Sequence, residues 1–112
     1  MSNDGSGTPP AGPVPPAETA ETAETFESGP GRFRALVEGR EVAVLDFRVV
    51  DGRWDLVHTH AEPAARGTGI ASRLVRFALD RARVEGVQII PSCPYLPVWL
   101  DRHPTYQDLV AS

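Results

Sequence analysis

The chain has 112 residues, which is enough for one domain. Its formal net charge of −4 is unevenly divided, because residues 1–30 hold five carboxylates and no arginine while residues 31–112 hold eleven arginines and ten carboxylates. A nearly neutral domain beside an acidic tail lacks the basic surface of a nucleic-acid-binding protein, so we expect no nucleic-acid partner. The single cysteine, Cys93, excludes an internal disulfide and a thiolate zinc site. No segment reads as a signal peptide or a membrane span, and we expect a cytoplasmic protein without a membrane partner.

Residues 1–30 differ in composition from the rest of the chain. They contain six of the eleven prolines and four of the ten glycines, and Phe26 is their only aromatic residue. Such a segment cannot bury enough apolar surface to offset the entropy of ordering it. We therefore predict a disordered tail over residues 1–30 and a single domain over residues 31–112. Deletion of residues 1–28 is then expected to change neither stability nor ligand affinity.

Three segments alternate apolar and polar residues, as half-buried strands do: residues 33–37, 41–50 and 53–60. Gly39-Arg40 predicts a tight turn between the first two, and Asp51-Gly52 is a strong hairpin signal between the second and third. The apolar parity changes within the second segment, which predicts a bulge near Val44. The expected result is an antiparallel meander of three strands.

The apolar period becomes helical over residues 70–85, and Gly86 follows as a helix stop. The β-branched run at residues 87–90 predicts a buried strand, which a helical crossover would place parallel to the third strand. Residues 96–102 predict a short helix ended by Pro104. The fold class is therefore α/β, with a mostly antiparallel sheet, one parallel strand pair, a long helix on one face and a V-shaped cleft between the third and fourth strands.

A glycine-containing loop, Arg66 to Ala71, joins the third strand to the long helix. Gly67 and Gly69 allow a ligand to approach the backbone, and a helix N-terminus offers unpaired amides and a favourable dipole, which together suit a pyrophosphate. The loop is not a Walker loop, because no Gly-Lys-Ser/Thr follows. It is also not a dinucleotide fingerprint, because the third glycine is missing. On these residues alone, a plain loop turn remains the alternative.

The segment Arg66-x-x-Gly69-x-Ala71 resembles the Arg/Gln-x-x-Gly-x-Gly/Ala motif of GCN5-related N-acetyltransferases. Four ordered segments resemble the small, single-domain members of that family: His58-Thr59, Arg66 to Ser72, Ile90 to Tyr95 and His103 to Tyr106. The resemblance covers roughly residues 32 to 110. It implies an acetyl-CoA-dependent N-acetyltransferase that acts on an amine of unknown identity.

The resemblance also implies which residues bind acetyl-CoA. The pyrophosphate would bind the loop and the first turn of the helix: Arg66, Gly67, Thr68, Gly69, Ile70, Ala71 and Ser72. The pantetheine arm would follow the end of the third strand: His58, Thr59, His60 and Ala61. The acetyl group would lie in the cleft, and Cys93 and Tyr95 would lie near the thioester.

Three residues are candidates for catalysis, and each has a structural alternative. His58 could be a general base, because an imidazole takes up a proton at neutral pH, or it could be a strand residue bonded to a backbone carbonyl. Cys93 could be a nucleophile activated by His58 or by a helix N-terminus, or simply a small buried apolar side chain. Tyr95 could protonate the departing thiolate or only pack. No metal is expected, because the spacing of His58, His60 and Cys93 supports no zinc site.

We favour direct attack of an amine on the thioester, through a tetrahedral intermediate that backbone N–H groups stabilise. One alternative is acyl-enzyme or thioesterase chemistry through Cys93. Another is a non-catalytic CoA-binding or interaction module, which the short chain makes credible. The expected partners are acetyl-CoA and an acceptor amine, and the expected state is a monomer or a weak homodimer.

Overall fold

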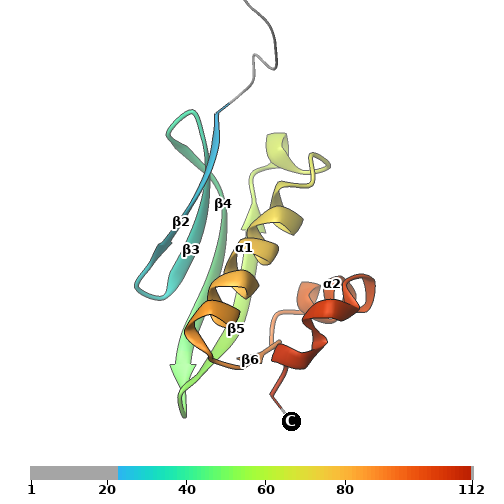
Figure 1. The fold of residues 1–112 in the computed structure, drawn as a ribbon. Helices are drawn as coiled ribbons and strands as arrows, with labels where there is room; N and C mark the ends of the chain where they lie inside the picture. The colour runs from blue at the N-terminus through green and yellow to red at the C-terminus, as the bar shows by residue number, and fades with distance from the viewer. Residues whose placement is uncertain (1–22, 112) are drawn as a thin grey trace, which may run out of the picture.

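The computed structural model describes residues 23–111, and all of its strands lie in one sheet beside two helices (Figure 1). The strands are β2 (Glu24–Gly29), β3 (Arg32–Val37), β4 (Arg40–Val50), β5 (Arg53–Ala61) and β6 (Ile89–Ile90). The helices are α1 (Ile70–Glu85) and α2 (Tyr95–Arg102), with 3-10 turns η1 (Pro63–Ala65) and η2 (Pro104–Leu109). The strand order is β2-β3-β4-β5-β6, antiparallel throughout except for the parallel pair of β5 and β6. The predicted α/β class is confirmed.

Two tight hairpin turns set the meander from β3 to β5. Asp51 and Gly52 have φ values of 52° and 74°, as a two-residue turn with both central residues left-handed requires. Glu38 and Gly39 form the other turn, with φ values of 52° and 81°. This turn lies one residue earlier than the predicted Gly39-Arg40, because the left-handed conformation falls on Glu38 and not on Arg40.

Two bulges shift the register of the meander. Between β3 and β4, Ala35 pairs with Ala43 while Leu36 pairs with Glu41, so that Val42 is the extra residue. The bulge predicted near Val44 therefore lies two residues earlier. A second, unpredicted bulge lies in β5. Asp46 pairs with His58 and the next β4 residue, Phe47, pairs with Leu56, so that Val57 is the extra residue.

Residues 24–29 are not part of a tail, which corrects the boundary predicted at residue 30. They form β2, which pairs with β3 over its whole length. Phe26 faces α1, where its ring stacks on Phe77 at 5.6 Å between centroids. The Pro-rich and Gly-rich composition of residues 1–30 as a whole concealed six residues whose partners are distant in sequence. The prediction for residues 1–22 lies outside the described residues.

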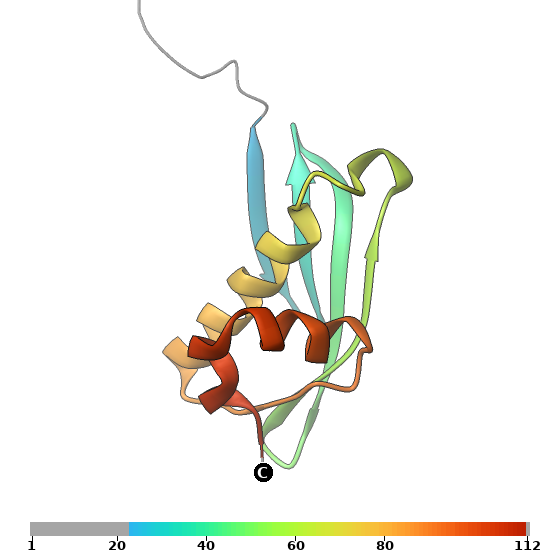
Figure 2. The ribbon, with the colours of Figure 1, turned by 90° about the vertical axis from the view of Figure 1, so that its right-hand side faces the viewer.

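Both helices lie on one side of the sheet, as two perpendicular views show (Figures 1 and 2). The helix predicted over residues 70–85 is confirmed with those bounds, and Gly86 ends it with φ of 71°. Its buried side chains are Ile70, Leu74, Val75, Ala78, Leu79 and Ala82. They pack against buried strand residues that include Phe33, Leu45, Leu56 and Ile89. In the described part of the chain, no helix is long and apolar enough to cross a membrane.

Candidate active site

The loop before α1 is held in shape by its own side chains. The Thr68 hydroxyl donates to the Ala65 carbonyl at 2.5 Å, and Arg66 Nε donates to the Ala61 carbonyl at 3.1 Å. Gly67 and Gly69 both have φ of 83°, a left-handed conformation that glycine adopts at little cost. Gly69 is the residue that caps α1, so these contacts fix the approach of the chain to the helix.

The loop and the first turn of α1 present unpaired backbone amides. The first helical hydrogen bond runs from the Arg73 amide to the Gly69 carbonyl at 3.1 Å. Within residues 23–111, no acceptor bonds to the amides of Gly67, Gly69, Ala71 or Ser72. Unpaired amides at the positive end of a helix dipole are a suitable binding site for a phosphate group.

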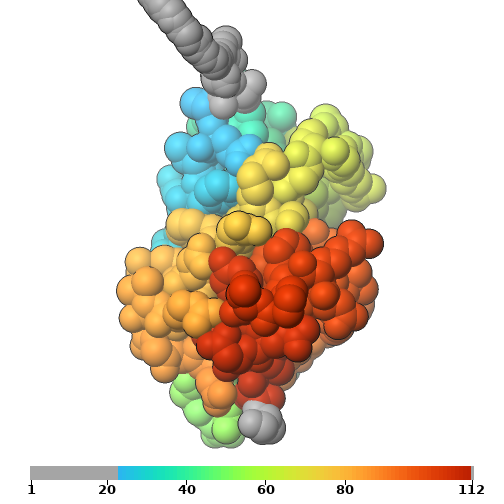
Figure 3. Space-filling model, turned by 45° about the vertical axis from the view of Figure 1, so that its right-hand side comes forward, coloured from blue at the N-terminus to red at the C-terminus, as the bar shows by residue number. Residues whose placement is uncertain are grey.

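These amides open onto one surface hollow, which the loop, the first turn of α1, Ala61 and Tyr95 line together. Tyr95 is the first residue of α2, so the hollow lies between the two helices and the end of β5. In Figure 3 the start of α1 (yellow) and α2 (orange) lie next to each other on this face. Of the predicted loop residues, Arg66, Gly67, Gly69, Ile70 and Ala71 line this hollow, whereas Thr68 lines a different hollow together with Glu24 and Arg73.

Ser72 has a partner that the sequence did not indicate. Its hydroxyl oxygen accepts a hydrogen bond from the Trp99 indole at 2.8 Å, which ties α1 to α2. The hydroxyl hydrogen of Ser72 stays available to a ligand, because the oxygen acts only as an acceptor toward Trp99.

An ion pair from the far edge of the sheet supports the loop. Arg73 donates to both carboxylate oxygens of Glu24, at 2.7 and 2.8 Å, and its Nη1 donates to the Thr68 carbonyl at 3.0 Å. The hydrogen bond from Arg73 lowers the pKa of Glu24, against the opposing effect of burial. A Cβ atom at Gly69 would lie 3.0 Å from Arg73 Nη1. Sequence reasoning missed this bridge, because 49 residues separate its two ends.

The predicted cleft follows from the early end of β6. Trp54 pairs with Ile89 and Asp55 pairs with Ile90, after which the Cys93 amide makes one more bond, to the Leu56 carbonyl at 2.8 Å. The chain then turns into α2, while β5 continues to Ala61 beside β4 alone. The second half of β5 thus has an open backbone edge within the described part of the molecule.

The open edge exposes specific backbone groups. The Glu62 amide donates to the Val42 carbonyl at 2.8 Å, and in an antiparallel pair alternate residues bond to the same neighbour. The backbone groups of Thr59 and Ala61 therefore point away from β4 and toward the cleft, where the Ala61 carbonyl already accepts a hydrogen bond from Arg66 Nε. Such groups can pair with the amides of an extended ligand, as a further strand would.

The side chains of this half of β5 alternate between the two faces of the sheet. Thr59 faces the helices, where its hydroxyl lies 3.3 Å from Cys93 Sγ. His58 and His60 lie on the helix-free face with their rings stacked at 6.3 Å between centroids. His58 Nδ1 lies 3.5 Å from Asp46 Oδ2. His58 is therefore not the neighbour that could activate Cys93, because the contact of the thiol is with Thr59.

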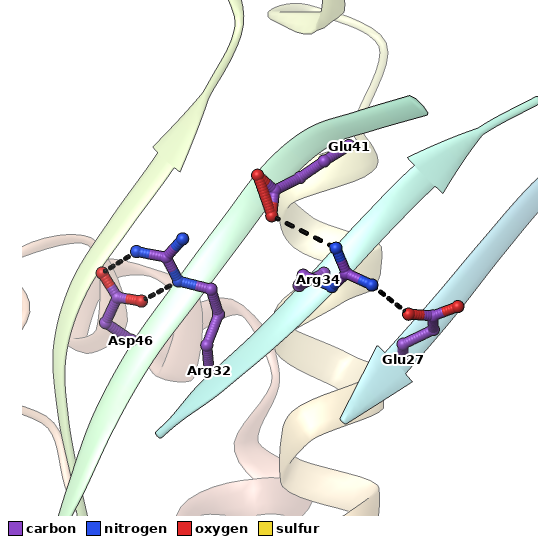
Figure 4. A network of polar contacts seen from close by, with 5 residues as sticks. All are labelled: Glu27, Arg32, Arg34, Glu41 and Asp46. Carbon is purple, nitrogen blue, oxygen red and sulfur yellow. Dashed lines mark hydrogen bonds and ion pairs between the residues drawn. The ribbon is translucent and has the colours of Figure 1, made fainter. Parts of the chain in front are cut away.

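A network of charged side chains covers the helix-free face of the strands (Figure 4). Arg32 donates to Asp46 at 2.6 Å, and Arg34 pairs with Glu27 and lies 3.8 Å from Glu41. Since Asp46 also contacts His58, the network extends to the candidate base. No sequence motif indicated these pairs, because they depend on strand register.

The described residues contain no cluster of three or more His, Cys, Asp or Glu side chains that could hold a metal ion. Cys93 is a free, buried thiol with 5% of its surface exposed. One buried carboxylate that sequence reasoning did not single out, Asp55, lies in the last parallel pair of β5 with β6.

The fold and the loop define an α/β domain with a phosphate-binding helix N-terminus beside a split in the sheet. Residues 32–109 match the sequence profile of the GCN5-related N-acetyltransferases. The chain therefore belongs to this family of N-acetyltransferases, which use acetyl-CoA, and its acceptor is unspecified.

Solved structures agree with the family. An NMR structure of a GCN5-like protein from Staphylococcus aureus has 25% identity and a TM-score of 0.58, over 79% of this chain and 88% of that one. The ribosomal-protein-S18-alanine N-acetyltransferase from Escherichia coli shares the fold, with 16% identity and a TM-score of 0.53, over 73% of this chain and 53% of that one. A ribosomal-protein-alanine N-acetyltransferase from Brucella melitensis has 23% identity and a TM-score of 0.50, over 72% and 61%. The chain thus spans little more than half the length of the last two.

Proposed function

We propose that this chain transfers an acetyl group from acetyl-CoA directly to a primary amine at the open edge of β5. The observation that carries the proposal is that two sets of unpaired backbone groups lie beside the same hollow. The free amides at the start of α1 and the free edge of β5 meet at one hollow, in which Ala61 and the loop are both lining residues. One surface suits a pyrophosphate and the other suits a chain of amides.

Acetyl-CoA supplies an acyl group that its thioester activates toward attack by a nitrogen atom. In this proposal the amides of Gly67, Gly69, Ala71 and Ser72 bind the pyrophosphate, and the guanidinium of Arg66 adds positive charge. The backbone groups of Thr59 and the Ala61 amide bind the pantetheine arm and orient it along β5. The predicted contacts of the loop and of the end of β5 are thus assigned to backbone groups more than to side chains.

His58 is proposed as the base that removes the proton from the attacking amine. It is exposed on the helix-free face, in a hollow that it shares with His60 and Asp46. Asp46 faces Nδ1, so the other ring nitrogen, Nε2, is the one free to accept the proton. The acceptor is proposed to approach from this face, opposite the helices. The amine nitrogen forms the new C–N bond, the C–S bond breaks, and the thiolate receives a proton from Tyr95 or from water.

Direct attack is favoured over an acyl-enzyme at Cys93. The contact of the thiol is with the neutral Thr59 hydroxyl, and the thiol is almost completely buried. Burial disfavours a thiolate, which is the nucleophilic form of cysteine, and the Thr59 hydroxyl is an uncharged partner. The role proposed for Cys93 is to line the thioester end of the cleft.

Intact-mass measurement together with thiol release tests this proposal. The chain has no lysine, so acetylation of the protein itself has few amine targets and an adduct on Cys93 would stand out. We expect CoA thiol release from acetyl-CoA only when an amine from a panel of peptides and small amines is present, and no acetyl adduct. A hydroxylamine-labile adduct of one acetyl group that Cys93→Ala abolishes would establish the acyl-enzyme instead. Release without any acceptor would indicate a thioesterase, and binding without release would indicate a binding module.

We also propose a cytoplasmic location and a monomeric or weakly dimeric state. The single cysteine, which can form no internal disulfide, supports the first, and size-exclusion chromatography with light scattering at several concentrations tests the second.

A further inference from the structure

Asp55 is the one charged side chain that is buried among the described residues. It lies in β5 with 5% of its surface exposed, between the core residues Trp54 and Leu56. Burial of a carboxylate is unfavourable unless strong partners compensate for the lost water. An apolar residue would fill the same space without that cost, so the partners of Asp55 indicate what the carboxylate does.

The partners join Asp55 to the segment that leads into α2. Ser92 donates its hydroxyl hydrogen to Asp55 Oδ1 at 2.5 Å, and Arg48 Nε donates to Oδ2 at 3.2 Å. Arg48 lies on the neighbouring strand with most of its side chain in solvent. Ser92 lies 37 residues further along the chain, directly before Cys93.

The contact with Ser92 occurs where β5 and the chain after β6 separate. Asp55 and Ile90 form the last parallel pair, and the Ser92 amide then bonds back to the Ile90 carbonyl at 2.9 Å. The Cys93 amide donates to the Leu56 carbonyl at 2.8 Å. The side chain of Ser92 is therefore bonded to β5 through Asp55, and the backbone of Cys93 is bonded to β5 through Leu56.

We propose that Asp55 is a positioning residue, which holds Ser92 and thereby fixes the place of Cys93 and the point at which the cleft opens. The carboxylate acts through Ser92 and not on the substrate. For its effect on turnover this inference rests on the proposed function, whereas its effect on the Cys93 thiol does not. Neither the loop motif nor the candidate catalytic residues include this pair.

The test removes the hydroxyl of Ser92, because Ser92 is exposed and its replacement leaves the Asp55–Arg48 pair in place. We expect Ser92→Ala to increase the rate of Cys93 alkylation by iodoacetamide about tenfold, because the segment then loses its hydrogen bond to a charged group and exposes the thiol more often. The same variant should lower kcat about tenfold, with KM and the Kd for CoA within about twofold of wild type, because the loop at α1 is untouched.

Two further variants give the proposal its controls. Ser92→Thr retains the hydroxyl and should restore both alkylation rate and kcat to near the wild-type values. Arg48→Gln removes only the exposed partner of Asp55 and should change neither. Alkylation and kcat within about twofold of wild type in Ser92→Ala would overturn the proposal. Equal effects in Arg48→Gln and Ser92→Ala would overturn it as well, because the ion pair would then be responsible. If the wild type has no turnover but alkylation responds as expected, the proposed function fails and the positioning role remains.

Discussion

The two halves of β5 have the same backbone conformation and opposite surroundings. Residues 53–56 pair with β4 on one side and with β6 or the Cys93 segment on the other, and Asp55 and Leu56 are buried. Residues 58–61 pair with β4 alone, and the side chain of His58 is 61% exposed. The bulge at Val57 separates the halves. One strand thus supplies part of the core and, four residues later, an open edge.

A domain this small can therefore hold both a stable core and a binding site. The binding groups of the second half are backbone amides and carbonyls, which need no further burial of side chains. Substitutions of apolar core residues in the first half should therefore change stability, and substitutions in the second half should change binding or turnover.

The largest effect is expected in the first half of β5. Leu56 is fully buried against α1, so Leu56→Ala leaves a cavity and should lower the free energy of unfolding by about 2–5 kcal/mol. Urea denaturation followed by circular dichroism measures this loss. Thr59→Ala in the second half is the matched comparison and should cost less than about 1 kcal/mol. Comparable losses in both variants would contradict the division of the strand.

The next effect concerns β2, which lies at the opposite edge of the sheet. Deletion of residues 1–29 removes β2 and the half-buried Phe26 ring, and should lower the free energy of unfolding by about 2–3 kcal/mol. Deletion of residues 1–22 is the matched control and should leave the melting temperature unchanged. Equal melting temperatures for the two deletions would show that β2 contributes nothing to the fold.

A smaller effect, on turnover alone, is expected at the exposed end of β5. His58→Ala should lower kcat about 100-fold or more, because a positioned general base contributes on that order, and should leave the CoA affinity unchanged. Cys93→Ser should keep a larger part of the activity, because the thiol takes no part in direct attack. Steady-state kinetics at saturating acetyl-CoA compares the two. A larger loss in Cys93→Ser than in His58→Ala would favour the acyl-enzyme.

The smallest effect is expected for the bridge between β2 and the loop. Because Arg73 lowers the pKa of Glu24 below its ordinary value of 4.5, the pair stabilises the fold above that pH and its contribution is lost as the pH falls through the lower, folded-state pKa. The side chain of Arg73 is nearly half exposed, so Glu24→Gln should cost less than about 1 kcal/mol at pH 7. Melting temperatures of wild type and Glu24→Gln should converge below pH 4.5. A difference that is independent of pH would assign the effect to packing.

Local signals in the sequence predicted most of the fold. Asp51-Gly52, the helix over residues 70–85 and the stop at Gly86 each depend on neighbours in the chain, and the structure confirms them. Residues 24–29 depend instead on β3 and α1, so composition alone placed them in a tail. The turn at Glu38-Gly39 lies one residue before the predicted turn for a similar reason. The register of β4 decides which residue takes the left-handed conformation.

Only the part of the candidate site that has a sequence motif could be predicted. The Arg66 to Ala71 loop has such a motif, and the amides of Gly67, Gly69 and Ala71 have no acceptor among the described residues. The Glu24–Arg73 bridge, the Asp46–His58 contact and the Asp55–Ser92 pair have none, because each joins elements that meet only in the folded sheet. The relation of His58 to Cys93 could not be predicted either, since strand alternation and the bulge at Val57 decide which face each side chain occupies.

The central claim is that the loop before α1 binds the pyrophosphate of acetyl-CoA. Isothermal titration of acetyl-CoA into wild type, Gly69→Val and Gly86→Val tests it most directly. The two glycines lie at opposite ends of α1 with φ of 83° and 71°, so valine strains the backbone in a similar way at both. Wild type and Gly86→Val should bind with similar affinity, and Gly69→Val should fold but not bind. Unchanged affinity in a folded Gly69→Val protein would contradict the claim and place the pyrophosphate elsewhere.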